Sequence, residues 1–221
     1  MSYKAVHRMG TGDTLRTRAV QGTHEPPMTW WAAYRQDIGR YVRYSGKSTL
    51  RKTILVLLTE QGLWALLQYR VTHALYRSSL PWTVKKPLLL FALFWQKLIE
   101  VLTGICLPGR AEIGPGLYIG HFGPLVVHPD AVIGRRCNLS QGVTIGVSGR
   151  GGRRGVPRIG DRVYIASNAV VVGKITVGDD AVIGANSVVR EDVAPHTTVL
   201  GVPATVISQR GSEDYIDPSE P

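Results

Sequence analysis

Residues 159–189 read IGDRVYIASNAVVVGKITVGDDAVIGANSVV, and an aliphatic residue returns there at every sixth position. A period of six fits neither the 3.6-residue turn of an α-helix nor the two-residue alternation of an ordinary strand. It predicts a solenoid of very short strands whose aliphatic side chains point inward. Chance spacing in an ordinary β domain is the alternative, and the length of the phased run argues against it. The in-phase residues are Ile113, Ile119, Val127, Ile133, Leu139, Ile145, Ile159, Ile165, Val171, Val177, Ile183 and Val189.

The period is interrupted twice. The step from Ile119 to Val127 is eight residues, which places an insertion at 121–124, sequence HFGP. The step from Ile145 to Ile159 is fourteen residues, which places a longer, glycine- and arginine-rich insertion around 149–155. Insertions in a solenoid leave the stack at a corner and commonly build its binding face. We therefore expect the chemistry of this protein at these two corners.

Composition limits the class of protein. The chain has 221 residues, a formal net charge of +10 and two cysteines. The excess of basic over acidic residues suggests an anionic partner, which could be a nucleic acid, a membrane surface or a phosphate-bearing cofactor. We expect no nucleic acid, because the sequence has no recognised binding motif. Two cysteines are too few for a disulfide framework, so we expect reduced thiols in a cytoplasmic protein.

The chain is expected to divide into four segments. Residues 1–27 lack an apolar signal-peptide core and are expected to be disordered. Residues 28–105 show helical periodicity and are expected to pack on the open end of the solenoid or on a neighbouring subunit. Residues 106–207 form the solenoid, and residues 208–221 are expected to be a flexible acidic tail.

The most apolar window lies between Pro87 and Trp95, within a helix expected over Leu88–Leu102. It is far shorter than the roughly 20 residues needed to cross a bilayer. Two interpretations stay open for segment 82–97, which has Lys85 and Lys86 before the apolar window and carries Trp82 and Trp95 near its ends. One is peripheral contact with a membrane surface, and the other, which is the more frequent case, is burial in an oligomer.

Residues 113–207 resemble the hexapeptide-repeat acyltransferases. The resemblance narrows to the serine acetyltransferase group through three motifs of the repeats and three of the helical region: QGVTIG (141–146), IGANSVV (183–189), GVPA (201–204), DIGRY (37–41), GLWALLQYRVTHALYR (62–77) and LTGI (102–105). It implies a mainly β protein, a left-handed parallel β-helix with an N-terminal α-helical region. It also implies acetyl transfer from acetyl-CoA to a hydroxyl, in homotrimers or dimers of trimers with active sites between neighbouring β-helices.

His121 matches the catalytic histidine of this group. A hydroxyl is a poor nucleophile at neutral pH, and a neutral imidazole within hydrogen-bond reach can accept its proton. A solvated corner histidine is the alternative reading, and the position in the first insertion favours catalysis. We expect no metal, because the residues between His128 and His196 contain no further histidine that could complete a zinc site.

The second insertion is expected to bind acetyl-CoA. Guanidinium groups pair with phosphate in a two-pronged geometry, so the phosphates of the cofactor are expected at Arg150, Arg153 and Arg154. Small residues along the later coils permit close approach to backbone, so the pantetheine arm is expected near Ala166, Ser167, Gly184 and Ala185.

The chain departs from the group at the residues that hold the amino-acid acceptor. In the group, an acid precedes the catalytic histidine, and Gly120 stands at that position here. A second acid orients this histidine in the group, and Cys106 stands at that position. A helical aspartate aligns with Ser45, and a loop histidine with Val156. Burying the ammonium group of an amino acid without a carboxylate partner costs free energy. Because the acid that orients the histidine is also missing, we expect a backbone carbonyl to orient His121.

We therefore expect an acceptor other than L-serine, and three functions are weighed in order of preference, the first being the main prediction. The first is O-acetylation of a saccharide in exopolysaccharide or capsule biosynthesis. The second is serine O-acetylation for cysteine biosynthesis. The third is a non-catalytic trimeric scaffold built on a decayed transferase.

Overall fold

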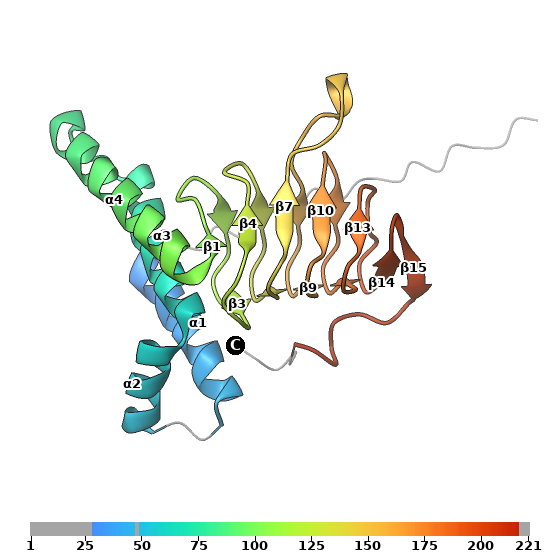
Figure 1. Cartoon of the computed structure of the whole chain (residues 1–221), viewed down its shortest axis with the longest axis horizontal. Coiled ribbons are helices and arrows are strands. Elements are labelled where there is room, and N and C mark those ends of the chain that lie inside the picture. Colours follow the sequence, from blue (N-terminus) through green and yellow to red (C-terminus); the bar gives the residue numbers. More distant parts are fainter. Residues whose placement is uncertain (1–27, 47–48, 217–221) are drawn as a thin grey trace, which may run out of the picture.

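The computed structural model describes residues 28–46 and 49–216. The predicted disordered start, residues 1–27, lies outside this part of the chain. The described residues form four helices followed by a stack of short strands (Figure 1). The helices are α1 (Trp30–Tyr44), α2 (Leu50–Thr59), α3 (Gln61–Arg77) and α4 (Trp82–Thr103).

Local sequence explains the start of α1 and the end of α4, whereas the start of α4 differs from the expected one. The hydroxyl of Thr29 accepts a hydrogen bond from the Ala32 amide at 3.2 Å and caps α1. Gly104 adopts the left-handed conformation that ends α4. We expected the last helix to begin at Leu88, after Pro87, but α4 begins six residues earlier and continues through this proline. A proline removes one backbone donor, and one such loss is tolerated in a helix of 22 residues.

The strands line three flat faces of a solenoid. The first face contains β1 (Ile105–Cys106), β4 (Leu125–Val127), β7 (Thr144–Gly146), β10 (Val170–Val172) and β13 (Val188–Val189). The second contains β2 (Glu112–Ile113), β5 (Val132–Ile133), β8 (Arg158–Ile159) and β11 (Thr176–Val177). The third contains β3 (Tyr118–Ile119), β6 (Asn138–Leu139), β9 (Tyr164–Ile165), β12 (Val182–Ile183), β14 (Thr198–Gly201) and β15 (Ala204–Ser208). Strand pairs along each face are parallel, and only the closing pair β14–β15 is antiparallel.

The predicted six-residue period is confirmed by the core. Each in-phase aliphatic residue from Ile113 to Val189 is buried, with at most 7% of its surface exposed. The small residues four places later are fully enclosed, at 0% exposure: Ala131, Cys137, Val143, Val163, Ala169, Ala181 and Ser187. Inward burial of one aliphatic and one small side chain per repeat therefore sets the width of the coil.

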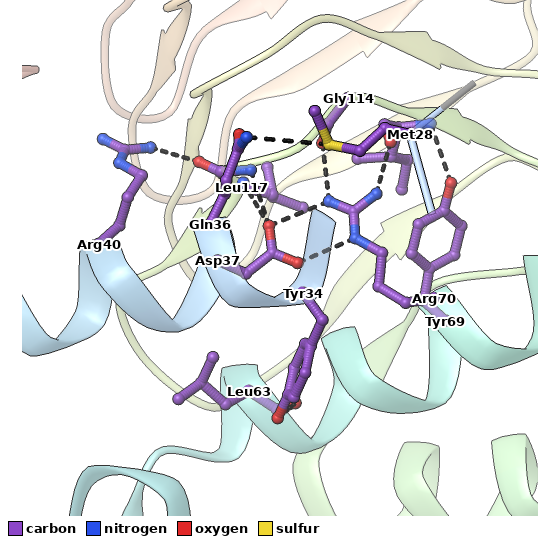
Figure 2. Close-up of polar contacts among 12 residues, drawn as sticks. Met28, Tyr34, Gln36, Asp37, Arg40, Leu63, Tyr69, Arg70, Gly114 and Leu117 are labelled. Atoms are coloured by element: carbon purple, nitrogen blue, oxygen red, sulfur yellow. Dashed lines mark hydrogen bonds and ion pairs between the residues drawn. The ribbon is translucent and has the colours of Figure 1, made fainter. Parts of the chain in front are cut away.

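The helices close the N-terminal end of the solenoid, as expected. Arg70 on α3 donates to Asp37 on α1 at 2.9 Å and 3.0 Å, and both side chains are buried (Figure 2). Asp37 also accepts from the amides of Gly116 and Leu117, at 2.8 Å and 3.0 Å. Arg70 in turn donates to the carbonyl of Ile113 at 2.7 Å. This pair joins two helices to the first coil and satisfies backbone groups that the coil exposes at its open end.

The end of the chain differs from the flexible tail expected over 208–221, as far as it is described. The amide of Ser212 donates to the carbonyl of Asp180 at 2.9 Å. The ring of Tyr215 stacks on Tyr164 at 4.5 Å, and Ile216 is 1% exposed. Aromatic stacking and apolar burial hold residues 212–216 against the third face despite their acidic composition.

Candidate active site

The first insertion lies at the edge where the third face turns into the first. In the third face Ile119 pairs with Leu139, Leu139 with Ile165, and Ile165 with Ile183. The residues that follow these strands therefore stack in register along one edge of the solenoid. We call this the His121 edge, and it contains Gly120, His121, Ser140, Gln141, Ala166, Ser167, Gly184 and Ala185.

His121 is exposed at this edge. Its ring forms no hydrogen bond with any residue in the described part of the chain, so the backbone carbonyl that we expected to orient it is not found there. The imidazole is thus exposed and not engaged by any described residue. His128 differs, because its Nδ1 accepts from the amide of Asp130 at 3.1 Å and so serves a local turn.

The second insertion leaves the opposite edge of the first face, after β7, and contains the short 3₁₀ helix η1 (Gly151–Arg153). Figure 1 shows this loop projecting well away from the stack. A cavity of about 890 Å³ lies at its base. Four of its lining residues are basic, namely Arg150, Arg154, Lys174 and Arg190. The cavity has the size and charge of a site for a phosphate-bearing ligand.

Two of these basic residues were missed in the sequence. Lys174 follows β10 and Arg190 follows β13, so the stacking of the first face brings both beside the loop. A signal was available, because Arg190 directly follows an inward aliphatic residue at a position where glycine is usual. Of the predicted cofactor residues, Arg150 and Arg154 line the cavity, while the side chain of Arg153 lies outside the described part of the structure.

The predicted site residues fall into two groups that the single chain does not unite. His121, Ala166, Ser167, Gly184 and Ala185 lie on one edge of the first face. The arginine loop lies on the other edge, with the strands of that face between them. Position 184 does require a small residue, because a Cβ added to Gly184 would lie 3.2 Å from the carbonyl oxygen of Val199.

Other residues occupy the positions at which the resemblance predicted charged side chains for binding the acceptor or orienting the histidine. Burial raises the pKa of the Cys106 thiol to about 12, so this side chain is uncharged at neutral pH. Ser45 ends α1, and its hydroxyl donates to the Val42 carbonyl at 2.7 Å. Val156 packs against the core. Within residues 28–46 and 49–216, no group of three or more histidine, cysteine and acidic side chains is arranged to hold a metal ion.

Comparisons with known proteins agree on one family. The model of the bacterial transferase hexapeptide family (six repeats) matches residues 157–191. A serine acetyltransferase of Bacillus pumilus is 37% identical over 163 residues, which cover 74% of this chain and 71% of the relative.

Solved structures give the same family. The serine acetyltransferase of Neisseria gonorrhoeae in complex with serine superposes with a TM-score of 0.66 at 32% identity, covering 81% of this chain and 69% of that chain. The enzyme of Brucella abortus in complex with coenzyme A gives 0.68 at 30% identity, covering 82% and 69%.

These findings confirm some predictions and correct others. The left-handed parallel β-helix and the acyltransferase class are confirmed. The main functional prediction, acetylation of a saccharide in polysaccharide biosynthesis, is wrong, because the relatives by sequence and by structure are serine acetyltransferases. The error came from treating the lost acidic positions as loss of the amino-acid substrate. The chain belongs to the serine acetyltransferase family of hexapeptide-repeat acyltransferases.

Proposed function

We propose that this protein transfers the acetyl group of acetyl-CoA to the side-chain hydroxyl of L-serine, the second of the three functions weighed above. The observation that carries the proposal is the similarity to serine acetyltransferases over about three quarters of the chain, helices included. The exposed imidazole of His121 at the first insertion supports it, because it supplies a base where the repeat is interrupted.

The chemistry assigned to His121 is general base catalysis. Its neutral imidazole takes the proton of the serine hydroxyl as the oxygen attacks the thioester carbon. The carbon–sulfur bond of the tetrahedral intermediate then breaks, and the leaving thiolate recovers the proton from the imidazolium. Backbone N–H groups of the coil that faces the thioester are the donors proposed for the oxyanion.

Acetyl-CoA is assigned to both edges of the first face. The basic cavity with Arg150 and Arg154 suits its phosphates, and we assign Arg153 to the same group. The small residues of the His121 edge suit the pantetheine arm: Ala166, Ser167, Gly184 and Ala185. Because the two edges lie apart in one chain, we propose a homotrimer in which the loop of one subunit faces the His121 edge of its neighbour.

The exposed apolar surface of α4 supports assembly beyond the trimer. Only Ala92, Ile99 and Thr103 of this helix are buried. A surface hollow of about 340 Å³ is lined by Phe91, Phe94, Trp95 and Leu98. An exposed apolar surface of this kind is normally covered, and we propose that α4 of a second trimer covers it in a cytoplasmic dimer of trimers.

Peripheral membrane contact through 82–97 is the competing arrangement for this surface. No helix among the described residues has the length and apolarity to cross a bilayer. Sedimentation of the wild type and of a Phe91→Glu, Phe94→Glu variant tests the assembly, and we expect the variant to have half the mass. Equal masses, with flotation of the wild type on anionic vesicles, would instead assign the surface to a membrane.

The function is tested by following thiol release from acetyl-CoA with L-serine as acceptor. We expect His121→Ala to lose about 10²- to 10⁴-fold in kcat with an unchanged melting temperature. His128→Ala is the matched control and should stay within a few-fold of wild type. Full activity of His121→Ala would remove this residue as the base, and the absence of serine-dependent release from wild type would refute the function itself.

A further inference from the structure

The segment that follows β15 returns along the third face toward the four helices, which we call the helical cap (Figure 1). Near its start, the amide of Ser212 donates to the carbonyl of Asp180 at 2.9 Å. At its far end, the hydroxyl of Tyr44 in α1 donates to the carbonyl of Tyr215 at 3.3 Å. Ile216 is buried there. The last described residues therefore lie beside the last turn of α1.

A basic pocket lies along the preceding turns of the same helix. It has a volume of about 210 Å³ and is formed by α1 and the first two coils. Four of its lining residues are arginines, namely Arg35, Arg40, Arg43 and Arg136. None of the lining residues in the described part of the chain is acidic. The pocket therefore concentrates positive charge and suits an anionic occupant.

The walls of this basic pocket are held by direct contacts. Arg40 is 5% exposed, and its Nη1 donates to the carbonyls of Gly116 and Cys137 at 2.7 Å and 3.2 Å. A Cβ added to Gly116 would lie 3.1 Å from Cγ of Arg136 and 3.4 Å from Cδ of Arg40, so these arginines share one wall. The guanidinium carbon of Arg40 lies 5.9 Å from the centre of the Tyr44 ring. Tyr44 thus connects the basic pocket with the last described residues.

The sequence that continues from this point is acidic. Residues 217–221, which lie outside the described part of the chain, read DPSEP. They contain two carboxylates, Asp217 and Glu220, and no basic side chain. Five extended residues span at most roughly 17 Å, and Asp217 directly follows Ile216. Because guanidinium groups pair with carboxylates in a two-pronged geometry, charge and position match this segment to the basic pocket.

We propose that Asp217 and Glu220 bind in the basic pocket of their own subunit. Residues 211–221 then form a strap that joins the later coils to the helical cap. This interaction is separate from the proposed acetyl transfer. The basic pocket lies at the edge between the second and third faces, whereas His121 lies at the edge between the third and first.

Disulfide trapping in the full chain tests this contact. Gly39 lines the pocket, and a Cβ added there meets no atom within 4 Å. We expect Gly39→Cys combined with Ser219→Cys to form a disulfide within one subunit on oxidation with diamide, identified by peptide mass mapping. Adding Asp217→Asn and Glu220→Gln should slow the trapping about tenfold, through the loss of two ion pairs, and high salt should also slow it. Gln36→Cys, at an exposed lining residue, replaces Gly39→Cys if that variant does not fold.

Gly152→Cys combined with Ser219→Cys is the matched control. A Cβ added to Gly152 also meets no atom within 4 Å, but this residue lies in the arginine loop, and we expect no bond within one subunit. Equal trapping of the two pairs would overturn the proposal, and so would the absence of a bond at the pocket or a bond that joins two subunits. Trapping that is insensitive to Asp217→Asn and Glu220→Gln would overturn it as well, because charge would then not hold the segment in place.

Discussion

The acidic residues Asp37 and Glu60 both belong to the helical cap, and their surroundings are opposite. Asp37 is 0% exposed and accepts hydrogen bonds from Arg70, Gly116 and Leu117. Glu60 is half-buried and pairs with no described residue. A carboxylate whose lone pairs are filled stabilises a junction, whereas one that is desolvated in part and left open is available for a ligand. The comparison separates a charge that is neutralised within the fold from one that has no partner among the described residues.

The largest effect is expected at the enclosed member of the pair. Asp37→Asn leaves the charge of Arg70 buried without a counter-charge, and breaking a buried pair in this way costs about 3–5 kcal/mol of unfolding free energy. Chemical denaturation of the variant measures the loss. Asp37→Asn combined with Arg70→Met should recover part of the stability, and a single variant as stable as wild type would contradict the structural role.

An intermediate effect is expected for the hydroxyl that joins the cap to the His121 corner. Tyr41 bridges the amide and carbonyl of Ile119, at 2.9 Å and 3.0 Å, and Tyr69 bridges Ile113 and Ala111 in the same way. Removing either hydroxyl leaves buried backbone groups unpaired, at about 1–3 kcal/mol. We expect Tyr41→Phe and Tyr69→Phe to destabilise similarly, as measured by denaturant unfolding.

Only one of these two variants should disturb substrate binding. Ile119 lies two residues before His121, whereas Tyr69 contacts the β2 region. We therefore expect Tyr41→Phe to raise the KM for L-serine and Tyr69→Phe to leave it unchanged. Equal kinetic behaviour of the two variants would mean that the corner is rigid without the hydroxyl of Tyr41.

The smallest effect on stability is expected for Glu60→Gln. A side chain without partners contributes little to folding, so the change in unfolding free energy should stay within about 0.5 kcal/mol. A melting curve of the unliganded variant checks this. A loss similar to that of Asp37→Asn would show that both carboxylates are structural and would end the distinction between them.

Sequence reasoning succeeded where the physics is local and repeated. The six-residue period identified the inward residues because every coil faces the same steric limit. The steps of eight and fourteen located both loops for the same reason. The solenoid was therefore predictable from one strand pattern, whereas its left-handed turn came from the resemblance to a family. The interruptions of the pattern pointed to His121 and the arginine loop as candidates, which stay predictions.

The acceptor was predicted wrongly because the argument examined single aligned positions. Gly120 and Cys106 hold no acid, and the missing charge was taken to exclude serine. Lys174 and Arg190 were overlooked, because their approach to the arginine loop depends on the stacking of β10 and β13.

The sequence by itself determined the coil, because aliphatic side chains at every sixth residue are all buried when each repeat packs on the next. It also determined where that coil is interrupted. Only the tertiary structure decided which charges meet: it enclosed Asp37 with Arg70, left Glu60 without a partner among the described residues, and placed the arginine loop on the edge opposite to His121. The physical reason is that the repeat constrains neighbours one coil apart, whereas the contacts of the helical cap join residues that no period relates.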